Sequence, residues 1–421
     1  MRFLLLNQYY PPDIAPTGNY LHDLARALIQ SGHQVKVLCS RQCYDGKARH
    51  PAREIRDGVK IARLPSIAFG RIGTIGKIVD YASYYSSLLC ALGFADERPD
   101  LILSLTTPPY LGLLGKLAAK RHACRHAHWI MDLYPDVLFA HGIVEKKGAA
   151  YQLLSKLTRF QLADAARVLT LGPTMADNVS SYTNHPVDWL PLWSDSELLP
   201  WPSDQPNPLR TQRGWSPGDV VFLYSGNMGL GHRFTEFLQV AEQLAGSGPR
   251  WVFSGGGKRR AELETAARAL PRARIEFLDY VPQRQLHAHL CAADVHLASL
   301  DEAWQGLMIP SKLQGSFAVG RPVLYVGGHN CEIASWILNS GGGWVVGQGD
   351  LKGLLRAVKE ALDPNERQKR GQAARAFAQK QFNKQICCGR IIELLTRPGL
   401  RDPSFEQDGL HESPSLSGKG I

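Results

Sequence analysis

RFLLLNQYYPPDIAPTGNYLHDLARALIQSGHQVKVLCS, residues 2–40, contains a complete strand–helix–strand pattern. The apolar run RFLLL ends in a proline-rich loop. The next segment, YLHDLARALIQSG, repeats its apolar residues at helical spacing and stops at a glycine. HQVKVLCS then has the composition of a second buried strand. Because two strands joined through a helix lie parallel in one sheet, this unit predicts an α/β fold built on a parallel sheet.

The same alternation continues along two separate parts of the chain. Strands are predicted at PDLILSLTT, AHWIMDLYP and ARVLTLG, with helices between them and a mostly helical stretch over residues 71–95. A segment rich in Pro, Ser and Asp interrupts the pattern between residues 193 and 219, and the alternation restarts at VVFLYSG. We therefore expect two Rossmann-like, doubly wound domains that face each other across a cleft.

The expected domain boundaries follow from these breaks. We assign residues 1–195 to a first domain, 196–218 to a linker, 219–380 to a second domain and 381–396 to a terminal helix. The helical pattern of the C-terminal region weakens near Phe382 and Asn383. The remaining tail, 397–421, is polar and rich in Ser, Pro and Gly, and is expected to be disordered.

Composition limits the class of partner. The 421 residues carry a formal net charge of +10, which favours phosphates, anionic lipid headgroups or nucleic acid. The basic residues are dispersed and no nucleic-acid motif accompanies them, so nucleic-acid binding is not expected. No run approaches the roughly 18 apolar residues of a membrane span, and no secretory signal is recognisable.

One histidine-rich stretch raises the question of a metal. RHACRHAH contains His122, Cys124, His126 and His128, and the pair His122 and His126 could share a helix face. The stretch is predicted to run from a helix end into a strand, however, and has no carboxylate nearby. We favour a basic, solvated loop and expect no metal site. The eight cysteines lack CxxC pairs and are expected to be free thiols.

A glycine-rich turn at the start of the second domain suits a diphosphate. In YSGNMGLGHRF, residues 224–234, a strand leads through Gly226, Gly229 and Gly231 into a helix. Glycines let the backbone approach a ligand, and a helix N-terminus offers free N–H groups to an anion. The spacing is neither a Walker motif nor a dinucleotide fingerprint. The alternative is a plain tight turn between a strand and a helix.

A second candidate anion site lies in IPSKLQGSFAVGRPVLYVGG, residues 309–328. A short apolar helix is predicted from Pro310 to Gly320, with Ser311 and Lys312 in its first turn. A hydroxyl, free N–H groups and a full positive charge all favour phosphate at that position. Two further turns, FSGGGKRR and GGHNCEIA, point to the same cleft. The alternative is that these are ordinary turns with solvated Lys and Arg. It explains each loop taken singly, but it explains the whole set less well.

These stretches resemble a known family, the retaining glycosyltransferases of the GT-B architecture in the large sucrose-synthase-like family four. More narrowly, they resemble the bacterial enzymes of capsule, exopolysaccharide and O-antigen assembly. The resemblance covers about residues 1–395. It is carried by NQYYPPDIAPTGNYLHDLARALIQSGHQVKVLC, HWIMDLYPDVLFAHGIV, FLYSGNMGLGH and, most specifically, LMIPSKLQGSFAVGRPVLYVGGHNCEIA.

The resemblance implies transfer of a sugar from a nucleotide-diphosphate sugar, with retention of configuration and without a cofactor or bound metal. It places the donor mainly on the second domain and the acceptor mainly on the first, and it predicts that the terminal helix crosses back to the first domain. The residues that it assigns to donor binding are Gly18, Asn19, Gly226, Asn227, Met228, Gly229, Arg233, Gly255, Lys258, Tyr280, Val281, Ser311, Lys312, Gly328 and Glu332.

The chain departs from the family at a pair of glutamates. Leu307 and Gly315 stand where many members have a Glu-x7-Glu pair, and the Pro-Ser-Lys variant remains. Lys312 is therefore the main candidate to stabilise the leaving diphosphate, with help from Arg233 or Lys258. Asp132 matches the aspartate of a His-Asp pair in the mid-domain strand and is the candidate group near the sugar. We thus expect Asp132 and Lys312 to be the catalytic residues.

The expected acceptor is a saccharide or lipid-linked saccharide in cell-surface polysaccharide synthesis. SLTTPPYLG is placed at the acceptor entrance by its position at a strand end. Basic residues of the first domain either contact anionic lipid or form a solvated helix face; they are Lys146, Lys147, Lys156 and Arg159. The expected location is the cytoplasm, with peripheral contact at the inner face of the cytoplasmic membrane as one option.

Two other functions fit the same architecture. A nucleotide-sugar 2-epimerase would need no acceptor and would release its product without a partner. A non-catalytic nucleotide-sugar-binding partner of a polysaccharide complex would bind the donor without turning it over, and the missing glutamate pair keeps this alternative open.

Overall fold

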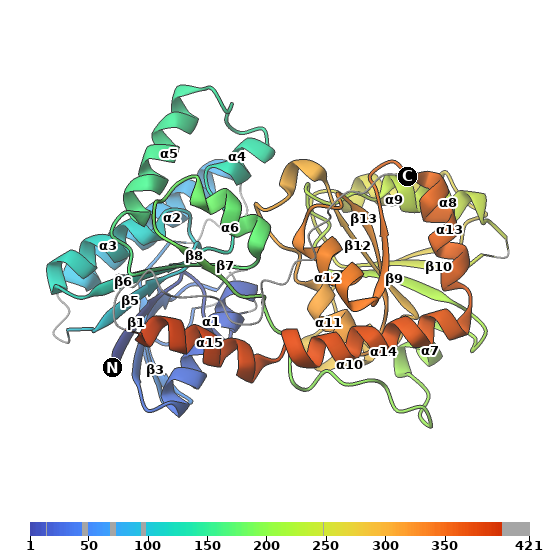
Figure 1. The fold of residues 1–421 in the computed structure, drawn as a ribbon, viewed down its shortest axis with the longest axis horizontal. Coiled ribbons are helices and arrows are strands. Elements are labelled where there is room, and N and C mark those ends of the chain that lie inside the picture. The colour runs from blue at the N-terminus through green and yellow to red at the C-terminus, as the bar shows by residue number, and fades with distance from the viewer. Residues whose placement is uncertain (14, 44–48, 68–72, 94–97, 247, 398–421) are drawn as a thin grey trace, which may run out of the picture.

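The computed structural model describes residues 1–13, 15–43, 49–67, 73–93, 98–246 and 248–397, which form two α/β lobes lying side by side (Figure 1). The predicted disordered tail falls, apart from Arg397, outside the described residues. Each lobe is a twisted sheet with helices on both faces, so the predicted fold of two doubly wound units is confirmed. No described helix combines the length and apolar character that crossing a bilayer requires.

The first lobe contains an eight-stranded sheet in the order β3-β4-β2-β1-β5-β6-β7-β8, in which the β3–β4 pair is antiparallel and the other pairs are parallel. Its strands are β1 (Arg2–Leu6), β2 (Gln34–Ser40), β3 (Arg53–Arg56), β4 (Val59–Leu64), β5 (Leu101–Ser104), β6 (Arg125–Trp129), β7 (Arg167–Thr170) and β8 (Val187–Trp189). Its helices are α1 (Pro16–Gln30), α2 (Gly73–Gly93), α3 (Leu111–His122), α4 (Asp136–Ala140), α5 (Ala149–Leu162) and α6 (Pro173–Ser180).

The central strands of this sheet are apolar on both sides because helices cover both faces. All four residues of β5 are buried. Leu4 and Leu6 of β1 pack against α2 and α3 on one face. Phe3 and Leu5 of the same strand belong to the core on the other face, with α1. The alternation along β1 thus assigns successive side chains to two cores.

The second lobe contains a six-stranded, fully parallel sheet in the order β11-β10-β9-β12-β13-β14. Its strands are β9 (Val221–Ser225), β10 (Arg250–Ser254), β11 (Ile275–Leu278), β12 (Val295–Leu300), β13 (Val323–Gly327) and β14 (Gly343–Val346). Its helices are α8 (Thr235–Gln243), α9 (Arg260–Arg268), the 3-10 turn η1 (Gln283–Gln285), α10 (Leu286–Cys291), the 3-10 turn η2 (Glu302–Trp304), α11 (Lys312–Ala318), α12 (Glu332–Ser340) and α13 (Leu351–Ala361). The strand order reverses between β9 and β12, and open α/β sheets bind ligands at the carboxyl ends of the strands beside such a point.

The C-terminal helical region crosses back to the first lobe, as the resemblance predicted. It divides into α14 (Pro364–Gln381) and α15 (Lys384–Thr396), and the break falls at the predicted Phe382 and Asn383. Phe382 is fully buried, and the Asn383 side chain accepts a hydrogen bond from the Ile386 amide at 3.1 Å, which caps α15. α15 packs on α1, and Lys384 Nζ lies 3.0 Å from Asp23 Oδ1 (Figure 1).

Several elements differ from the sequence prediction. The hairpin β3–β4, the short strand β8 and the helix α4 were not predicted, and the expected linker contains a helical turn, α7 (Pro208–Arg213). The helix expected from Pro310 to Gly320 is shorter, because Met308 is held extended by a backbone bridge to Asp132 and Gly320 adopts φ +70. Ser311 is consequently the N-cap and Lys312 the first helical residue.

Candidate functional site

Lys312 is the most unusual charged group of the second lobe. Its ammonium lies 4.7 Å from the centroid of the Tyr224 ring and 3.3 Å from His232 Nε2. Burial lowers the pKa of Lys312 to about 7. Within the described chain no carboxylate forms an ion pair with it. A cation held this way, without a counter-ion, is prepared for an anionic ligand.

His232 orients the lysine. Its Nδ1 lies 2.6 Å from the Ser299 carbonyl oxygen, which can only accept a hydrogen bond, so Nδ1 carries the proton. Nε2 is then an acceptor and takes a hydrogen bond from Lys312 Nζ. Burial, with the nearby Lys312 charge, lowers the pKa of His232 to about 3, which keeps the ring neutral. The imidazole therefore positions Lys312 without neutralising its charge.

Two glycine-rich turns meet directly beside this lysine. Gly226 has φ +130, and a Cβ there would lie 3.1 Å from Lys312 Cε. Gly255 has φ +122, and a Cβ there would come within 2.2 Å of the Gly226 carbonyl oxygen. Both conformations suit only glycine, and the two backbones touch as no side chain would permit. The two turns therefore lie directly against each other, and their shared role in binding a donor stays a prediction.

Hydrogen bonds between the turns decide which amides remain for a ligand. The Gly226 amide donates to the Ser254 carbonyl at 2.9 Å, and the Met228 amide donates to the Gly256 carbonyl at 2.6 Å. The Met228 side chain is fully buried as well, so this residue supports the turn. Among the described residues, the amides of Asn227 and Gly229 have no acceptor. Those two N–H groups, like the amides of Gly256 and Gly257 in the other turn, are free to meet a phosphate.

The other two predicted cations, Arg233 and Lys258, differ in whether a carboxylate already pairs with them. The Arg233 guanidinium is bound by Glu236 Oε1 at 2.7 Å and Asp301 Oδ2 at 3.2 Å, and its pKa is raised by these carboxylates. Its charge is already balanced, which weakens the expectation that it helps a leaving diphosphate. Lys258 is exposed and forms no ion pair with any described residue. Lys258 thus remains available at the rim of the site.

The remaining donor-site candidates of the second lobe surround these turns. Ser311 is exposed, and its hydroxyl does not cap its own helix. The Tyr280 ring is 62% exposed, and its hydroxyl donates to the Gly256 carbonyl at 3.4 Å. Val281 follows in the same loop and is half-buried. Gly328 lies farther along the sheet edge, where a Cβ would collide with the Gln305 amide at 1.5 Å.

Asp132 approaches the same junction from the first lobe. Its backbone pairs with Met308, four residues before Lys312, and the Leu133 amide donates to the Leu307 carbonyl at 3.0 Å. Burial raises the pKa of the Asp132 carboxyl to about 6. No described cation pairs with it. The two predicted catalytic residues therefore belong to segments that touch across the interlobe seam.

Glu332 takes a structural place that the sequence did not indicate. Its side chain is 2% exposed, and Oε1 accepts a hydrogen bond from the Met175 amide of α6 at 2.8 Å. A Cβ at Gly172 would lie 2.2 Å from Glu332 Cγ, so only glycine admits this approach. Burial raises the pKa of Glu332. The carboxylate of the second lobe thus caps a helix of the first. The expected contact of Glu332 with the donor stays a prediction.

Gly18 and Asn19 lie in the first turn of α1 rather than among the loops of the second lobe. Gly18 is buried, and a Cβ there would lie 2.8 Å from the Tyr9 carbonyl oxygen. This close approach brings α1 onto the proline-rich loop after β1. Asn19 is exposed on the same helix.

Among the described residues, no three His, Cys, Asp or Glu side chains come together as metal ligands would. His122 ends α3, whereas His126 and His128 lie in β6, so the suggested shared helix face is wrong. His128 Nε2 lies 2.9 Å from the Gln161 carbonyl oxygen, and burial lowers the pKa of His126 to about 2 and of His128 to about 4. His126 and His128 form a buried, hydrogen-bonded pair of neutral imidazoles in β6, so the solvated loop expected for this stretch is wrong at these two residues.

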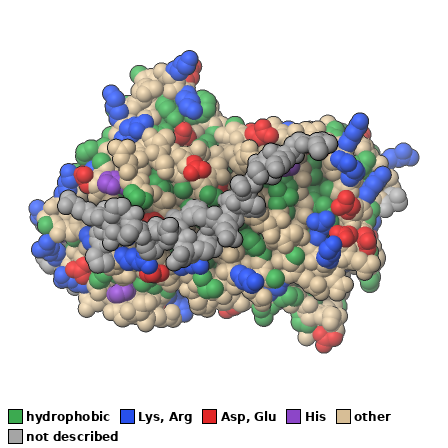
Figure 2. Space-filling view, in the orientation of Figure 1, with side chains coloured by type: hydrophobic (Ala, Val, Ile, Leu, Met, Phe, Trp, Pro, Cys, Tyr) green, Lys and Arg blue, Asp and Glu red, His purple; other side chains and the backbone are tan. Residues whose placement is uncertain are grey.

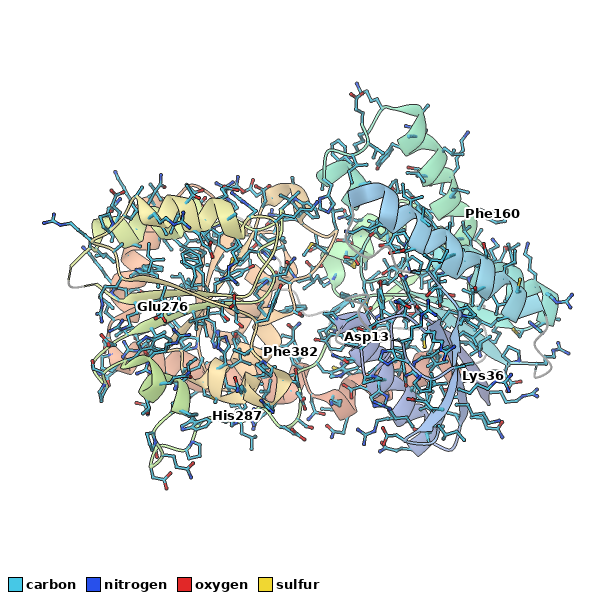
Figure 3. All side chains as sticks on the ribbon, turned by 180° about the vertical axis from the view of Figure 1, so that it is seen from behind. Asp13, Lys36, Phe160, Glu276, His287 and Phe382 are labelled. Carbon is cyan, nitrogen blue, oxygen red and sulfur yellow. The ribbon has the colours of Figure 1, made fainter. Side chains whose placement is uncertain are left out.

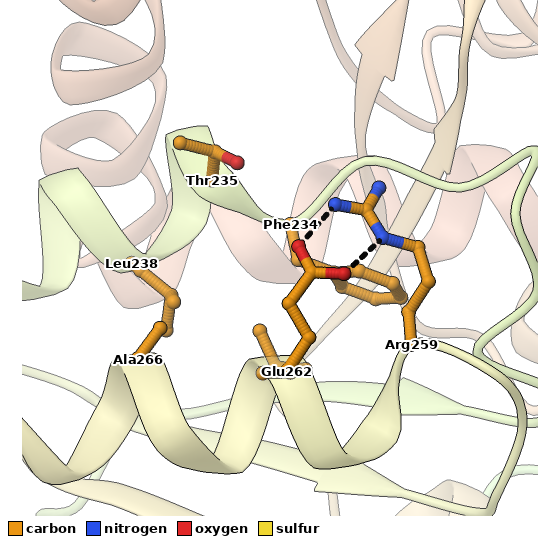
Figure 4. Close-up of a pocket in the computed structure, with 7 residues that line it drawn as sticks. Phe234, Thr235, Leu238, Arg259, Glu262 and Ala266 are labelled. Atoms are coloured by element: carbon orange, nitrogen blue, oxygen red, sulfur yellow. Dashed lines mark hydrogen bonds and ion pairs between the residues drawn. The ribbon is translucent and has the colours of Figure 1, made fainter.

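A small pocket elsewhere in the second lobe lies between α8 and α9 (Figure 4). It is lined by Phe234, Leu238 and Ala266, among others, and Arg259 pairs with Glu262 across its edge at 2.7 Å. Arg259 also bonds the His232 carbonyl, so this arginine supports the turn that carries His232. Sequence alone could not distinguish the structural role of Arg259 from that of the adjacent, unpaired Lys258.

Comparison with known proteins now defines the class. Residues 17–193 match the model of the Glycosyl transferase 4-like domain. The chain is 27% identical over 270 residues to Probable glycosyltransferase WbjE of Pseudomonas aeruginosa, covering 63% of this chain and 67% of the relative. It is 22% identical over 405 residues to Putative colanic acid biosynthesis glycosyl transferase WcaI of Escherichia coli, covering 93% of this chain and 99% of the relative.

A solved structure supports the fold. Anabaena Alr3699/HepE in complex with UDP-glucose superposes with a TM-score of 0.69 at 13% identity, over 94% of this chain and 99% of that chain. The two-lobed architecture, the domain match and the relatives together define a glycosyltransferase of GT-B fold. The match over residues 17–193 and the two relatives agree with the resemblance to glycosyltransferase family 4 that the sequence indicated.

Proposed function

We propose that this enzyme moves a sugar, with retention of configuration, from a nucleotide-diphosphate sugar to a saccharide or lipid-linked saccharide acceptor. The reaction would serve synthesis of a cell-surface polysaccharide. The donor would occupy the second lobe around Lys312, and the acceptor would approach from the first lobe near Asp132. The observation that carries this proposal is the half-buried Lys312, whose ammonium no described carboxylate balances, beside two interlocked glycine turns.

The chemistry that these groups can supply is stabilisation of the leaving diphosphate. Cleavage of a glycosyl–phosphate bond increases negative charge on the diphosphate, and a preorganised cation nearby lowers that barrier. Lys312 supplies the charge, and the free amides of Asn227 and Gly229 supply oriented dipoles. These groups suit a reaction that needs no metal ion, so we expect transfer to persist in the presence of a chelator.

Asp132 is the group that we place near the transferred sugar. Its pKa of about 6 leaves it largely ionised at neutral pH. A carboxylate there can stabilise the positive charge that develops on the sugar ring as the bond to phosphate breaks. Its backbone bridge to Met308 fixes its distance from the Lys312 segment, so formation of the interlobe seam and assembly of the site are the same event.

The relatives support the proposed substrates. WcaI is named for colanic acid biosynthesis, and the HepE structure holds UDP-glucose. Both WbjE and WcaI are named glycosyltransferases, which does not favour the 2-epimerase or the non-catalytic alternative.

A thermal-shift screen against UDP, GDP, ADP, dTDP and their sugars tests the donor site. We expect one nucleotide to raise the melting temperature of the wild type, and Lys312→Ala to lose most of that shift. Lys352→Ala is a matched control, because Lys352 is an exposed lysine in the first turn of α13 in the same lobe. If no nucleotide stabilises the wild type at millimolar concentration, the proposal fails.

A further inference from the structure

The two lobes are connected along their seam in two places. Seen from behind, Phe382 lies at the junction of the lobes, where α14 is followed by α15 (Figure 3). The second connection is the segment between β12 and α11, residues 301–311, which we call the strap. It ends directly before Lys312 and therefore runs beside the candidate donor site.

Charge on the surface does not indicate a further ligand site on the face seen in Figure 2. Lys, Arg, Asp and Glu side chains are scattered over both lobes there. The polar groups of the seam are different, because backbone contacts from both lobes hold them in place.

The strap is fixed to the glycine turn of the second lobe. The Asp301 amide donates a hydrogen bond to the Gly231 carbonyl at 2.9 Å. The buried Trp304 ring lies against Gly231, where a Cβ would come within 2.9 Å of the ring. Gly231 belongs to the turn that also carries the free amides of Asn227 and Gly229. The first half of the strap is therefore held on the turn that we expect to bind the diphosphate.

The next residues of the strap are fixed to the first lobe. The Asn178 side chain of α6 donates a hydrogen bond to the Gln305 carbonyl at 3.3 Å. Gly306 has φ +65, and a Cβ there would lie 2.4 Å from Asn178 Nδ2, so a side chain at Gly306 would collide with this contact. The Leu133 amide donates to the Leu307 carbonyl. Contacts with both lobes thus hold the backbone of Gln305 in one position.

The Gln305 side chain is a polar group without a partner at this position. It lies over Gly328, where a Cβ would be 1.5 Å from Gln305 Nε2. Gly328 follows β13, so the amide is at the carboxyl end of the sheet, where open α/β sheets bind ligands. Gln305 is half-buried, and its side chain forms no hydrogen bond with any described residue. Its N–H groups and its carbonyl oxygen are both left for a ligand.

Gln305 also stands on the segment that carries the proposed reacting groups. It precedes Met308, whose backbone pairs with Asp132, and Lys312 follows at the start of α11. Residues 306–310, GLMIP, contribute no polar side chain between them. If Lys312 holds the diphosphate and Asp132 lies near the reacting carbon, Gln305 is the first polar side chain of the strap on the far side of that pairing.

We propose that the Gln305 amide binds a hydroxyl of the donor sugar and thereby helps to select which sugar is transferred. A primary amide can donate to a hydroxyl oxygen and accept from a hydroxyl proton. A site built to bind a hydroxyl rejects the analogue that lacks it, because the amide is then left unpaired. The selected class is a sugar that is hydroxylated at the carbon facing Gln305. This inference rests on the proposed function, since it requires the donor at Lys312.

Isothermal titration calorimetry of the full chain tests this contact. The probes are the nucleoside diphosphate found in the donor screen, the sugar ester of it that stabilises the wild type most, and the forms of that ester that each lack one hydroxyl. The variant is Gln305→Leu, which keeps a side chain of similar size over Gly328 without polar atoms. Gln348→Leu is the matched control, because exposed Gln348 also supports the strap by accepting a hydrogen bond from the Glu302 amide at 3.3 Å.

Gln305→Leu should raise the dissociation constant of the sugar ester about tenfold, as expected for the loss of one hydrogen bond. The dissociation constant of the nucleoside diphosphate should stay within about twofold of the wild-type value, and Gln348→Leu should bind both probes as the wild type does. One deoxy ester should bind the wild type about tenfold more weakly than its parent, whereas Gln305→Leu should bind the two equally.

Two results would overturn the inference while the donor site stands. An equal loss of affinity for the diphosphate and its ester would mean that Gln305 only supports the strap. Deoxy esters that lose the same factor in the wild type and in Gln305→Leu would mean that no hydroxyl meets the amide. Should the leucine variant melt at a lower temperature than the wild type, Gln305→Ala serves for the same comparison. If no nucleotide binds the wild type, the proposed function fails and this inference fails with it.

Discussion

Nucleotide binding should draw a proton onto Lys312. With a pKa of about 7, the ammonium is half protonated at pH 7 and only about one tenth protonated at pH 8 in the unliganded protein. A diphosphate beside it favours the charged form and raises its pKa. Binding at pH 8 should therefore take up about 0.9 proton, against about 0.5 at pH 7.

Affinity should follow the same titration. Above the free-enzyme pKa, each unit of pH adds about 1.4 kcal/mol to the cost of protonating the lysine. The dissociation constant should then rise about tenfold from pH 8 to pH 9. His232 does not titrate in this window, because its pKa is about 3. The phosphates of the nucleotide are already ionised above pH 7.

Isothermal titration calorimetry in two buffers of different ionisation enthalpy measures the proton directly. Lys312→Arg is the matched control, since a guanidinium keeps its charge throughout the range and should bind without proton uptake. Buffer-independent heats for the wild type between pH 7 and pH 9 would refute the reasoning. Equal proton uptake by the arginine variant would also refute it, because another group would then be titrating.

Three further variants test other parts of the site. Asp132→Asn should lower the transfer rate by about 100-fold or more while nucleotide affinity stays unchanged. Wild-type activity should rise with pH through about 6 as the carboxyl ionises. Both rates are measured by nucleotide release. Gly255→Ala should lower the free energy of unfolding in urea by about 2–4 kcal/mol, because its Cβ would meet the Gly226 carbonyl oxygen. It should also abolish the rise in melting temperature that the nucleotide causes. A variant with the wild-type melting temperature would contradict this. Glu332→Ala should remove about 1–2 kcal/mol through the lost cap of α6 and increase proteolysis at the seam between the lobes; unchanged cleavage would mean that the cap does not hold the lobes together.

Much of the fold followed from periodicity because its elements are local. The break in the C-terminal helix was predictable, since Asn383 is a good cap and stands where the pattern fails. The β3–β4 hairpin was missed although REIRDGVKIARL contains a signal for it. Asp57 has φ +50 and Gly58 has φ +80, as the Asp-Gly turn of a hairpin requires.

The sequence predicted site residues only where the groups that act together are close to one another in the chain. Lys312 was found because it begins a helix near a glycine turn. The tautomer of His232 depends on the Ser299 carbonyl, 67 residues away in sequence. Glu332 reaches the Met175 amide across 157 residues, and no local pattern distinguishes that contact from donor binding. Contacts between residues far apart in the chain, within the second lobe and between the lobes, are therefore what the sequence alone left out.

The central claim, that Lys312 holds the diphosphate of the donor, is tested most directly by a crystal structure with the nucleotide that the screen identifies. The account predicts a β-phosphate oxygen within about 3 Å of Lys312 Nζ, with the amides of Asn227 and Gly229 facing the same group. A diphosphate bound elsewhere in the second lobe, with Lys312 still bonded only to His232, would contradict it.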